Sequence, residues 1–317
     1  MTRLRQPSWP ERTGRPVRHE PVFVLAPVRS YSTVTVALLA GHPGIYGFPE
    51  MLIFSADTVG ELIQREPRPR QVASFVEPQR SGILRAVADV LEGSQEEPAI
   101  ARAEEWLTDR CSWRSRQLMD HLLERVSPQV GLEKSPETVS TNRALRACLD
   151  SYPNARYIHL TRHPVSTMRS HIDHMQPWVG KSEKRRNTLV VLAASSWYLS
   201  HLRIVRSLDQ LPAAQWARMR AEDLLREPAG QLPKLLNWLG LPADRDVVGQ
   251  MMHTENWRFA GTGPSGRLFG GDPKFMLSPA LRPVREPGEL DFDESWGIPD
   301  EVRDRLTALA DALGYRS

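Results

Sequence analysis

Apolar residues along this chain form short continuous runs that alternate with longer stretches in which they recur every three or four positions. Four of the short runs have the length and composition of buried β-strands. They are Val22–Ala26, Val130–Glu133, Arg156–Thr161 and Gln215–Arg220. Helical periodicity fills the intervals, at 33–40, 83–93, 115–126 and 141–153, and in two pieces separated near Pro228. Short strands that alternate with helices indicate a parallel sheet covered on both faces. We therefore predict an α/β fold of three layers, with a central, mostly parallel sheet flanked by helices.

Two later segments depart from this pattern. The stretch "TLVVLAASSWYLSHLRIVRSL" at 188–208 is long and largely apolar, and it predicts a buried central helix with Trp197 in the core. No run of 18 apolar residues occurs, so we expect no membrane span. Residues 255–290 are rich in glycine and proline, which predicts an irregular covering segment rather than a separate domain.

Composition indicates which kinds of ligand the protein can bind and in which compartment it functions. The 317 residues carry a formal net charge of +3, which suits anionic ligands but is far from the charge of a nucleic-acid-binding protein. Five arginines fall within residues 1–20, where we expect a mobile basic tail before a single domain at 21–317. The two cysteines, Cys111 and Cys148, are not spaced as metal ligands, and the N-terminus has no apolar stretch resembling a signal peptide. These features predict a cytoplasmic protein.

The stretch "PVRSYST" at 27–33 joins the first predicted strand to the first predicted helix. Backbone N–H groups at the start of a helix are unpaired, and the helix dipole there is positive, so such a loop can hold a phosphate. Its hydroxyls and its arginine would add donors to an anion. The alternative is an ordinary turn whose serines cap the helix, and the stretch alone leaves both interpretations open.

Polar residues also follow three other predicted elements. Glu50 lies in "HPGIYGFPE", Lys134 follows a strand in "GLEKSPE", and Arg162 and Ser170 lie in "RHPVSTMRS". Because the carboxyl ends of parallel strands meet at one edge of a sheet, we expect the loop at 27–33 and the strand ends at Glu133 and Thr161 to converge on one crevice. Each residue alone could instead be an ordinary surface side chain or helix cap.

Two histidines have a spacing that suggests metal binding. His171 and His174 lie three positions apart beside Asp173. A metal site needs further ligands, and no third ligand segment is evident. We therefore interpret the pair as a surface helix face and expect no metal.

In this order, the four polar segments resemble those of sulfotransferases that use 3′-phosphoadenosine-5′-phosphosulfate (PAPS), nearest to the branch with tyrosylprotein and bacterial small-molecule enzymes. "PVRSYST" is similar to the family's 5′-phosphosulfate loop, and "RHPVSTMRS" to its 3′-phosphate element. "EKSP" is similar to a family lysine segment, and "MRAEDLLREP" to a later strand–helix junction. The likeness covers about residues 22–240 and implies the three-layer fold of P-loop NTPases.

The resemblance implies a role for each matching residue, with PAPS as co-substrate and no metal. Glu50 would be the general base, Lys134 would stabilise charge on the leaving group, and Arg29 would stabilise the transferring sulfonate. The residues implied in donor binding are Arg29, Ser30, Tyr31, Ser32, Thr33, Val34, Arg162, Ser170 and, from the C-terminal segment, Arg267. The expected acceptor is a hydroxylated small molecule, as in secondary metabolism. The sequence carries no signature of a particular acceptor or oligomeric state.

Two positions depart from the family pattern. Tyr31 stands where the loop normally has glycine, so either the loop bends differently or the ring lines the acceptor pocket. Ala221 replaces the usual tyrosine of the later junction, which removes one expected nucleotide contact.

Two other functions fit the same architecture. A P-loop nucleotide kinase would share the fold, but the chain has no G-x-x-x-x-G-K-S/T motif and no evident metal-holding aspartate at a strand end. A non-catalytic nucleotide-binding protein would share it too. The joint presence of Arg29, Glu50, Lys134, Arg162 and Ser170 favours an enzyme over a mere binding protein.

Overall fold

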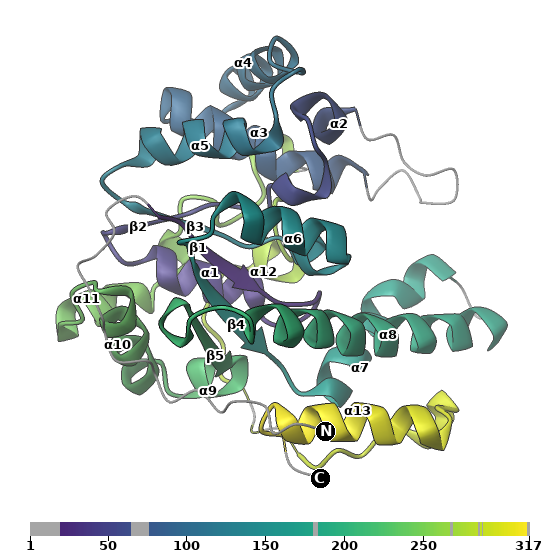
Figure 1. Ribbon diagram of the computed structural model, residues 1–317. Helices are drawn as coiled ribbons and strands as arrows, with labels where there is room; N and C mark the ends of the chain where they lie inside the picture. The colour runs from purple at the N-terminus through teal and green to yellow at the C-terminus, as the bar shows by residue number, and fades with distance from the viewer. Residues whose placement is uncertain are drawn as a thin grey trace.

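A computed structural model describes residues 20–64, 76–179, 183–266, 269–284, 286 and 288–315. At its centre lies a five-stranded sheet in the order β2-β3-β1-β4-β5 (Figure 1), and all neighbouring strands are parallel. The strands are β1 (Val22–Leu25), β2 (Ile45–Gly47), β3 (Val130–Glu133), β4 (Arg156–Thr161) and β5 (Trp216–Arg220). The predicted α/β architecture is confirmed, with β2 as a strand that the sequence pattern did not indicate.

Helices connect and cover these strands. The α-helices are α1 (Ser32–Ala40), α2 (Val59–Ile63), α3 (Val76–Glu92), α4 (Glu97–Thr108), α5 (Ser115–Val126), α6 (Asn142–Ser151), α7 (Pro164–Val179), α8 (Glu183–Leu208), α9 (Ala221–Arg226), α10 (Pro228–Leu239), α11 (Arg245–Met251), α12 (Pro273–Leu277) and α13 (Asp300–Ala312). Short 3₁₀ turns are η1 (Ile53–Ser55), η3 (Pro136–Val139), η4 (Ala213–Gln215), η5 (Thr254–Asn256), η6 (Pro264–Gly266) and η7 (Glu294–Trp296). The predicted break at Pro228 is confirmed, because this proline occupies the first turn of α10, where its missing N–H costs nothing.

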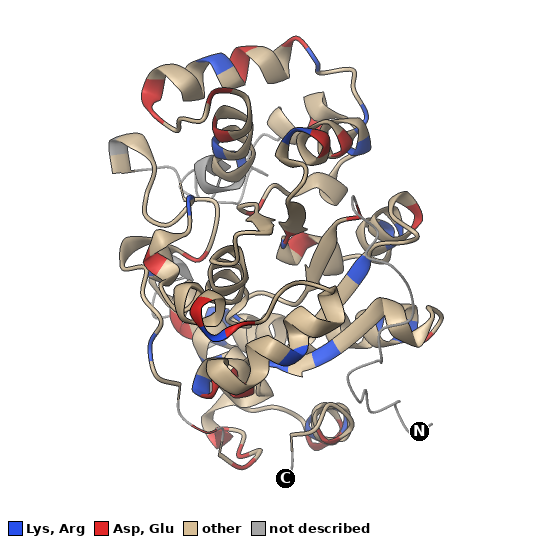
Figure 2. Cartoon of the chain, turned by 90° about the vertical axis from the view of Figure 1, so that its left-hand side faces the viewer, with Lys and Arg blue, Asp and Glu red and all other residues tan. Residues whose placement is uncertain are grey.

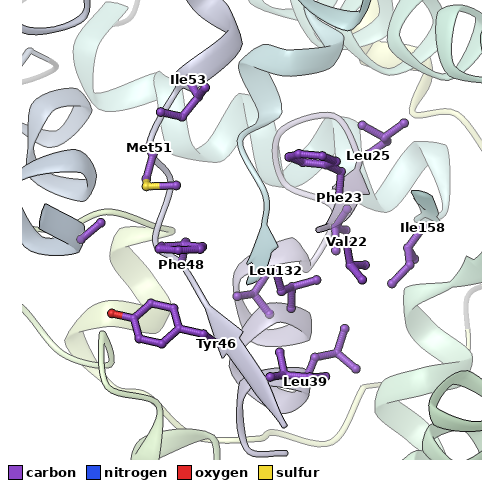
Figure 3. Close-up of a cluster of buried hydrophobic side chains, with 14 of the residues drawn as sticks. Val22, Phe23, Leu25, Leu39, Tyr46, Phe48, Met51, Ile53, Leu132 and Ile158 are labelled. Atoms are coloured by element: carbon purple, nitrogen blue, oxygen red, sulfur yellow. The ribbon is translucent and has the colours of Figure 1, made fainter. Parts of the chain in front are cut away.

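The central strands are surrounded by apolar side chains (Figure 3). All four residues of β1 are buried, and the ring of Phe23 lies 5.4 Å from those of Phe54 and Tyr152. Burying one such aromatic side chain contributes about 1.5–3 kcal/mol. A second apolar cluster joins α7, α8 and α13 around Trp197 and Tyr315. Charged residues lie mostly on the helices and loops around the sheet (Figure 2). The strands carry four of them, Glu133, Arg156, Arg218 and Arg220.

Helix α8 corrects one prediction. Trp197 is fully buried, as expected, but the helix flanks the sheet rather than running through the centre (Figure 1). Val191, Leu192 and Leu199 are 65%, 46% and 41% exposed. Residues Lys184–Leu208 also meet the length and hydropathy of a membrane span, which the apolar run length did not indicate. Half of the qualifying stretch is buried within the molecule, and core helices of soluble proteins meet the same criterion.

The C-terminal part is irregular between short helices. Segment 255–290 contains the end of η5, η6 and α12, and Asp272 lies at the carboxyl edge of the sheet beside α1. The division into one domain at 21–317 stays a prediction. The predicted mobile tail falls on residues 1–19, which lie outside the described part of the chain, and on Glu20.

Candidate active site

A cleft of about 740 Å³ opens at the carboxyl edge of the sheet. It brings together the loop after β1, the segment after β2, Arg162, the middle of α7 around Ser170 and the C-terminal segment at 269–284. The convergence expected from a parallel sheet is therefore present. The predicted residues that line the cleft are Arg29, Ser30, Tyr31, Ser32, Thr33, Val34, Glu50, Arg162 and Ser170.

The loop after β1 has an unusual backbone. Arg29 and Tyr31 both adopt left-handed conformations, with φ of 64° and 60°. Tyr31 is the N-cap of α1 and its side chain makes no capping hydrogen bond, so the interpretation of a serine-capped turn is wrong. The Ser30 hydroxyl is buried and, among the described residues, has no hydrogen-bond partner. The start of α1 thus offers backbone N–H groups and a buried hydroxyl to an anion.

The ring of Tyr31 stacks on an arginine that follows another strand, β4. Its centroid lies 3.8 Å from Cζ of Arg162, a cation–π contact. Arg162 also donates from Nη1 to the carbonyl of Arg29 at 2.6 Å, and its own carbonyl accepts from Trp197 Nε1 at 2.9 Å. Burial lowers the pKa of Arg162, although a guanidinium stays charged at neutral pH. Tyr31 therefore does adopt the strained left-handed conformation, and its ring lines the cleft beside a fixed guanidinium.

Arg29 joins two parts of the chain that are far apart in sequence. Its Nε donates to Ser170 Oγ at 3.1 Å, and its Nη1 lies 2.8 Å from Oδ1 of Asp272. Asp272 also donates its backbone N–H to Thr33 Oγ1 at 3.0 Å. The sequence analysis did not identify Asp272. The sequence "DPK" signals a helix cap there, and the side chain does cap α12, but nothing local indicates its contact with Arg29.

Lys134 and Glu50 form an ion pair beside the loop. Lys134 Nζ also donates to Thr33 Oγ1 at 3.1 Å. The side chain of Lys134 is only 3% exposed, whereas that of Glu50 is 23% exposed and reaches the cleft. A cation and a carboxylate therefore stand side by side where the loop, the cleft and β3 meet.

The two histidines of α7 line the cleft rather than an outer face, so their interpretation as a surface pair is wrong. Burial, followed by the charge of Arg29, lowers the pKa of His171 to about 4. Burial also lowers the pKa of His174. Both rings are neutral at pH 7. Within the described ranges, no group of three or more His, Cys, Asp or Glu residues is placed to hold a metal ion.

The remaining predicted positions are placed as follows. Ala221 is fully buried at the start of α9. Its neighbour Glu222 accepts hydrogen bonds from the backbone N–H of His163 at 2.8 Å and from the Tyr315 hydroxyl at 3.0 Å. Glu222 therefore fixes the segment after β4, and Leu225 of the same junction lines the cleft. Arg267 lies outside the described residues.

Comparison with known proteins decides the family. A family model described as "Sulfotransferase family" matches residues 21–245, well over half of the chain. The chain belongs to the sulfotransferase family. A search of curated proteins found no match.

Solved structures support the same fold. The sulfotransferase domain from the curacin biosynthetic pathway is 22% identical, with a TM-score of 0.72, over 94% of this chain and 98% of that one. The sulfotransferase domain from the Synechococcus PCC 7002 olefin synthase is also 22% identical, with a TM-score of 0.65, over 93% and 98% of the two chains. Sulfotransferase STF9 from Mycobacterium avium is 15% identical, with a TM-score of 0.54, over 94% and 78%. The architecture of this sulfotransferase is thus the P-loop-like fold that the family likeness implied. Membership of the sulfotransferase family sets the kinase interpretation aside.

Proposed function

We propose that this sulfotransferase moves a sulfuryl group from PAPS to a hydroxyl of a small molecule in the cytoplasm. The observation that carries the proposal is the convergence of Arg29, Ser170, Arg162 and the Lys134–Glu50 pair, which lie on four separate segments, at one cleft. Two structurally similar sulfotransferase domains come from a biosynthetic pathway and an olefin synthase, which supports a small-molecule acceptor and a place in secondary metabolism.

The polar groups of the cleft fit a donor with two anionic ends. The Ser30 hydroxyl and Arg162 Nε are buried and lack partners within the described part of the chain, so each is a donor available to an oxyanion. Arg29, Ser30, Ser32 and Thr33, with the first N–H groups of α1, would hold the 5′-phosphosulfate. Arg162 and Ser170 would hold the 3′-phosphate, and arginine suits this role because its planar fork matches phosphate oxygens.

The Lys134–Glu50 pair supplies the remaining chemistry. PAPS provides a sulfonate that is transferred as SO₃ to an oxygen nucleophile. Glu50 would accept the proton of the acceptor hydroxyl, and Lys134 would donate to the oxygen that bridges sulfur and phosphorus as negative charge develops on it. Lys134 can leave Glu50 for that oxygen without losing its contact with Thr33, since an ammonium has three donors.

A transfer assay with radiolabelled PAPS and a panel of alcohols and phenols tests the reaction. We expect Glu50→Gln to bind donor normally but to lose turnover by about 10²- to 10⁴-fold, the usual contribution of a general base. Glu137→Gln is the matched control, because Glu137 also lines the cleft but lies outside the Lys134–Glu50 pair. An unchanged kcat in Glu50→Gln would remove Glu50 from the mechanism.

Calorimetry with adenosine 3′,5′-bisphosphate tests the donor site. We expect binding without magnesium, and a large loss of affinity when Arg29 and Arg162 are both replaced by alanine. Binding without transfer to any acceptor would favour a non-catalytic nucleotide-binding protein. Absence of binding would overturn the proposed donor.

A further inference from the structure

The residues on either side of Lys134 hold the segment that carries Glu50. While Lys134 points toward the loop and the cleft, the side chains of Glu133 and Ser135 are buried beneath it, each no more than 2% exposed. Glu133 is the last residue of β3, so its position is fixed by pairing with Phe23 of the neighbouring strand. Three consecutive residues thus project from the rigid end of a central strand.

Each of these three residues binds one residue of the 50–52 segment. Lys134 pairs with the Glu50 carboxylate. The backbone of Met51 donates a hydrogen bond to the Glu133 carboxylate. The backbone N–H of Leu52 donates to Ser135 Oγ at 2.9 Å. The Ser135 hydroxyl in turn donates to Glu133 Oε1, which closes the network.

The held segment is in a conformation that it would not adopt on its own. Leu52 has φ of 60° and ψ of 21°, a left-handed backbone that is unfavourable for leucine. Such a residue persists only where its surroundings fix it, and strain of this kind concentrates at functional sites. The turn at Leu52 comes two residues after Glu50, so it fixes the path of the backbone segment that carries the Glu50 side chain.

Burying the carboxyl group of Glu133 is energetically costly. Burial raises the pKa of Glu133 to about 7, against the opposing effects of the Ser135 hydrogen bond and the charge of Lys134. The titratable groups that face Glu133 are Lys134, Glu50 and Cys148. Among the described residues Glu133 forms no ion pair of its own. An apolar side chain would fill this space without the desolvation cost, whereas a carboxylate can accept from Met51 and Ser135 together.

We propose that Glu133, acting through Ser135 and the backbone of Met51 and Leu52, is a positioning residue that aims Glu50 at the acceptor hydroxyl. This inference rests on the proposed role of Glu50 as the base. Glu133 does not touch the cleft and does not contact the reacting groups.

The test compares Glu133→Gln with the wild type by steady-state transfer kinetics and by calorimetry with adenosine 3′,5′-bisphosphate. We expect kcat to fall by about 10- to 100-fold, in line with the cost of misplacing a catalytic group. Nucleotide affinity should stay within about twofold of wild type, because the loop after β1 is held by other contacts. Ser135→Ala removes the hydrogen bond to Leu52 and should also lower kcat. This variant replaces Glu133→Gln in the test if Glu133→Gln does not fold. Thr138→Val is the control, since it alters a nearby buried hydroxyl outside the network.

A double-mutant cycle separates positioning from a structural role. If Glu133 acts only through Glu50, adding Glu133→Gln to Glu50→Gln should lower kcat no further. A full additional loss in the double variant, or a wild-type kcat in Glu133→Gln, would overturn this inference. A wild-type kcat in Glu50→Gln alone would instead overturn the proposed base, so the two failures are distinguishable.

Discussion

At the scale of single residues, Tyr31 shows how an unfavourable backbone is retained. A left-handed conformation costs a residue with a side chain about 1–2 kcal/mol. The stack of its ring on the Arg162 guanidinium is worth about 0.5–2 kcal/mol, so the contact offsets much of the strain. Because Arg162 also reaches the carbonyl of Arg29, the ring braces a guanidinium against the backbone of the loop itself.

Replacing Tyr31 with glycine should therefore separate stability from binding. Glycine adopts the left-handed region freely, so we expect the free energy of unfolding of Tyr31→Gly to change by less than about 1 kcal/mol. Its affinity for adenosine 3′,5′-bisphosphate should weaken several-fold, because Arg162 loses the surface that orients it. Tyr31→Phe keeps the ring and should bind as the wild type does. Urea denaturation and calorimetry measure the two effects, and equal affinity in Tyr31→Gly and wild type would contradict the bracing role.

At the scale of elements, the C-terminal segment at 269–275 lies against the loop after β1. Gly270 accepts a hydrogen bond from the backbone N–H of Glu50 at 2.9 Å, and Asp272 bonds both Thr33 and Arg29. The close approach needs glycine at 271, where a Cβ would lie 2.9 Å from Cγ2 of Thr33. Distant parts of the chain therefore pack against each other here. The Asp272 carboxylate is ion-paired with Arg29, the arginine that we assign to donor binding.

Neutralising Asp272 should strengthen donor binding. In Asp272→Asn the side chain still caps α12, since asparagine is as good an N-cap as aspartate. Arg29 no longer has to leave a carboxylate, and the side chains of this ion pair are partly exposed, so we expect affinity for adenosine 3′,5′-bisphosphate to rise about two- to fivefold. Calorimetry at low salt measures it, with the exposed Asp291→Asn as a control that should change nothing. A weaker affinity would instead make Asp272 part of the donor site.

The elements differ in how far the sequence could predict them. Strands β3 and β4 were predicted at their observed bounds because each is a buried run ended by polar residues. Strand β2 was missed because Ile45–Gly47 is three residues long and ends in glycine. The exposed face of α8 was missed because an apolar run does not reveal which of its sides another element covers.

The candidate site was predicted in part for the same reason. The predicted strand ends place Lys134 and Arg162 near one edge whenever the sheet is parallel, so their convergence followed from topology. Glu50 follows β2, which the pattern did not indicate, so its place at this edge was expected from the family likeness alone. The contact of Asp272 with Arg29 spans 243 positions, and no local pattern encodes it. The strain at Leu52 was equally hidden, because leucine carries no sequence signal for a left-handed backbone.

At the scale of the whole molecule, several histidines are buried in the neutral state. His159 on β4 and His201 on α8 are both fully buried, with Nε2 of the first 2.9 Å from Nδ1 of the second. Arg218 donates to His159 Nδ1 at 3.1 Å, so His159 must carry its proton on Nε2 and donate it to His201. Burial lowers the pKa of His201 to about 3 and that of His163 to about 4. Together with His171 on α7, these neutral histidines lie on the sheet, at the start of α7 and on α8.

This arrangement predicts that the protein loses stability in mild acid. The unfolded chain binds a proton at His163 and at His201 near the ordinary pKa of 6.5, whereas the folded chain does so only near pH 3–4. The stabilisation is therefore complete above pH 6.5 and is lost as the pH falls toward the folded pKa. Each such histidine contributes a slope of up to about 1.4 kcal/mol per pH unit to the free energy of unfolding.

Urea denaturation between pH 7 and 5 measures this slope. In His201→Gln the side chain can still accept the hydrogen bond from His159. We expect this variant to take up about one proton fewer on unfolding, which lowers the slope of stability against pH. Equal slopes in His201→Gln and wild type would mean that His201 is not held neutral by the fold.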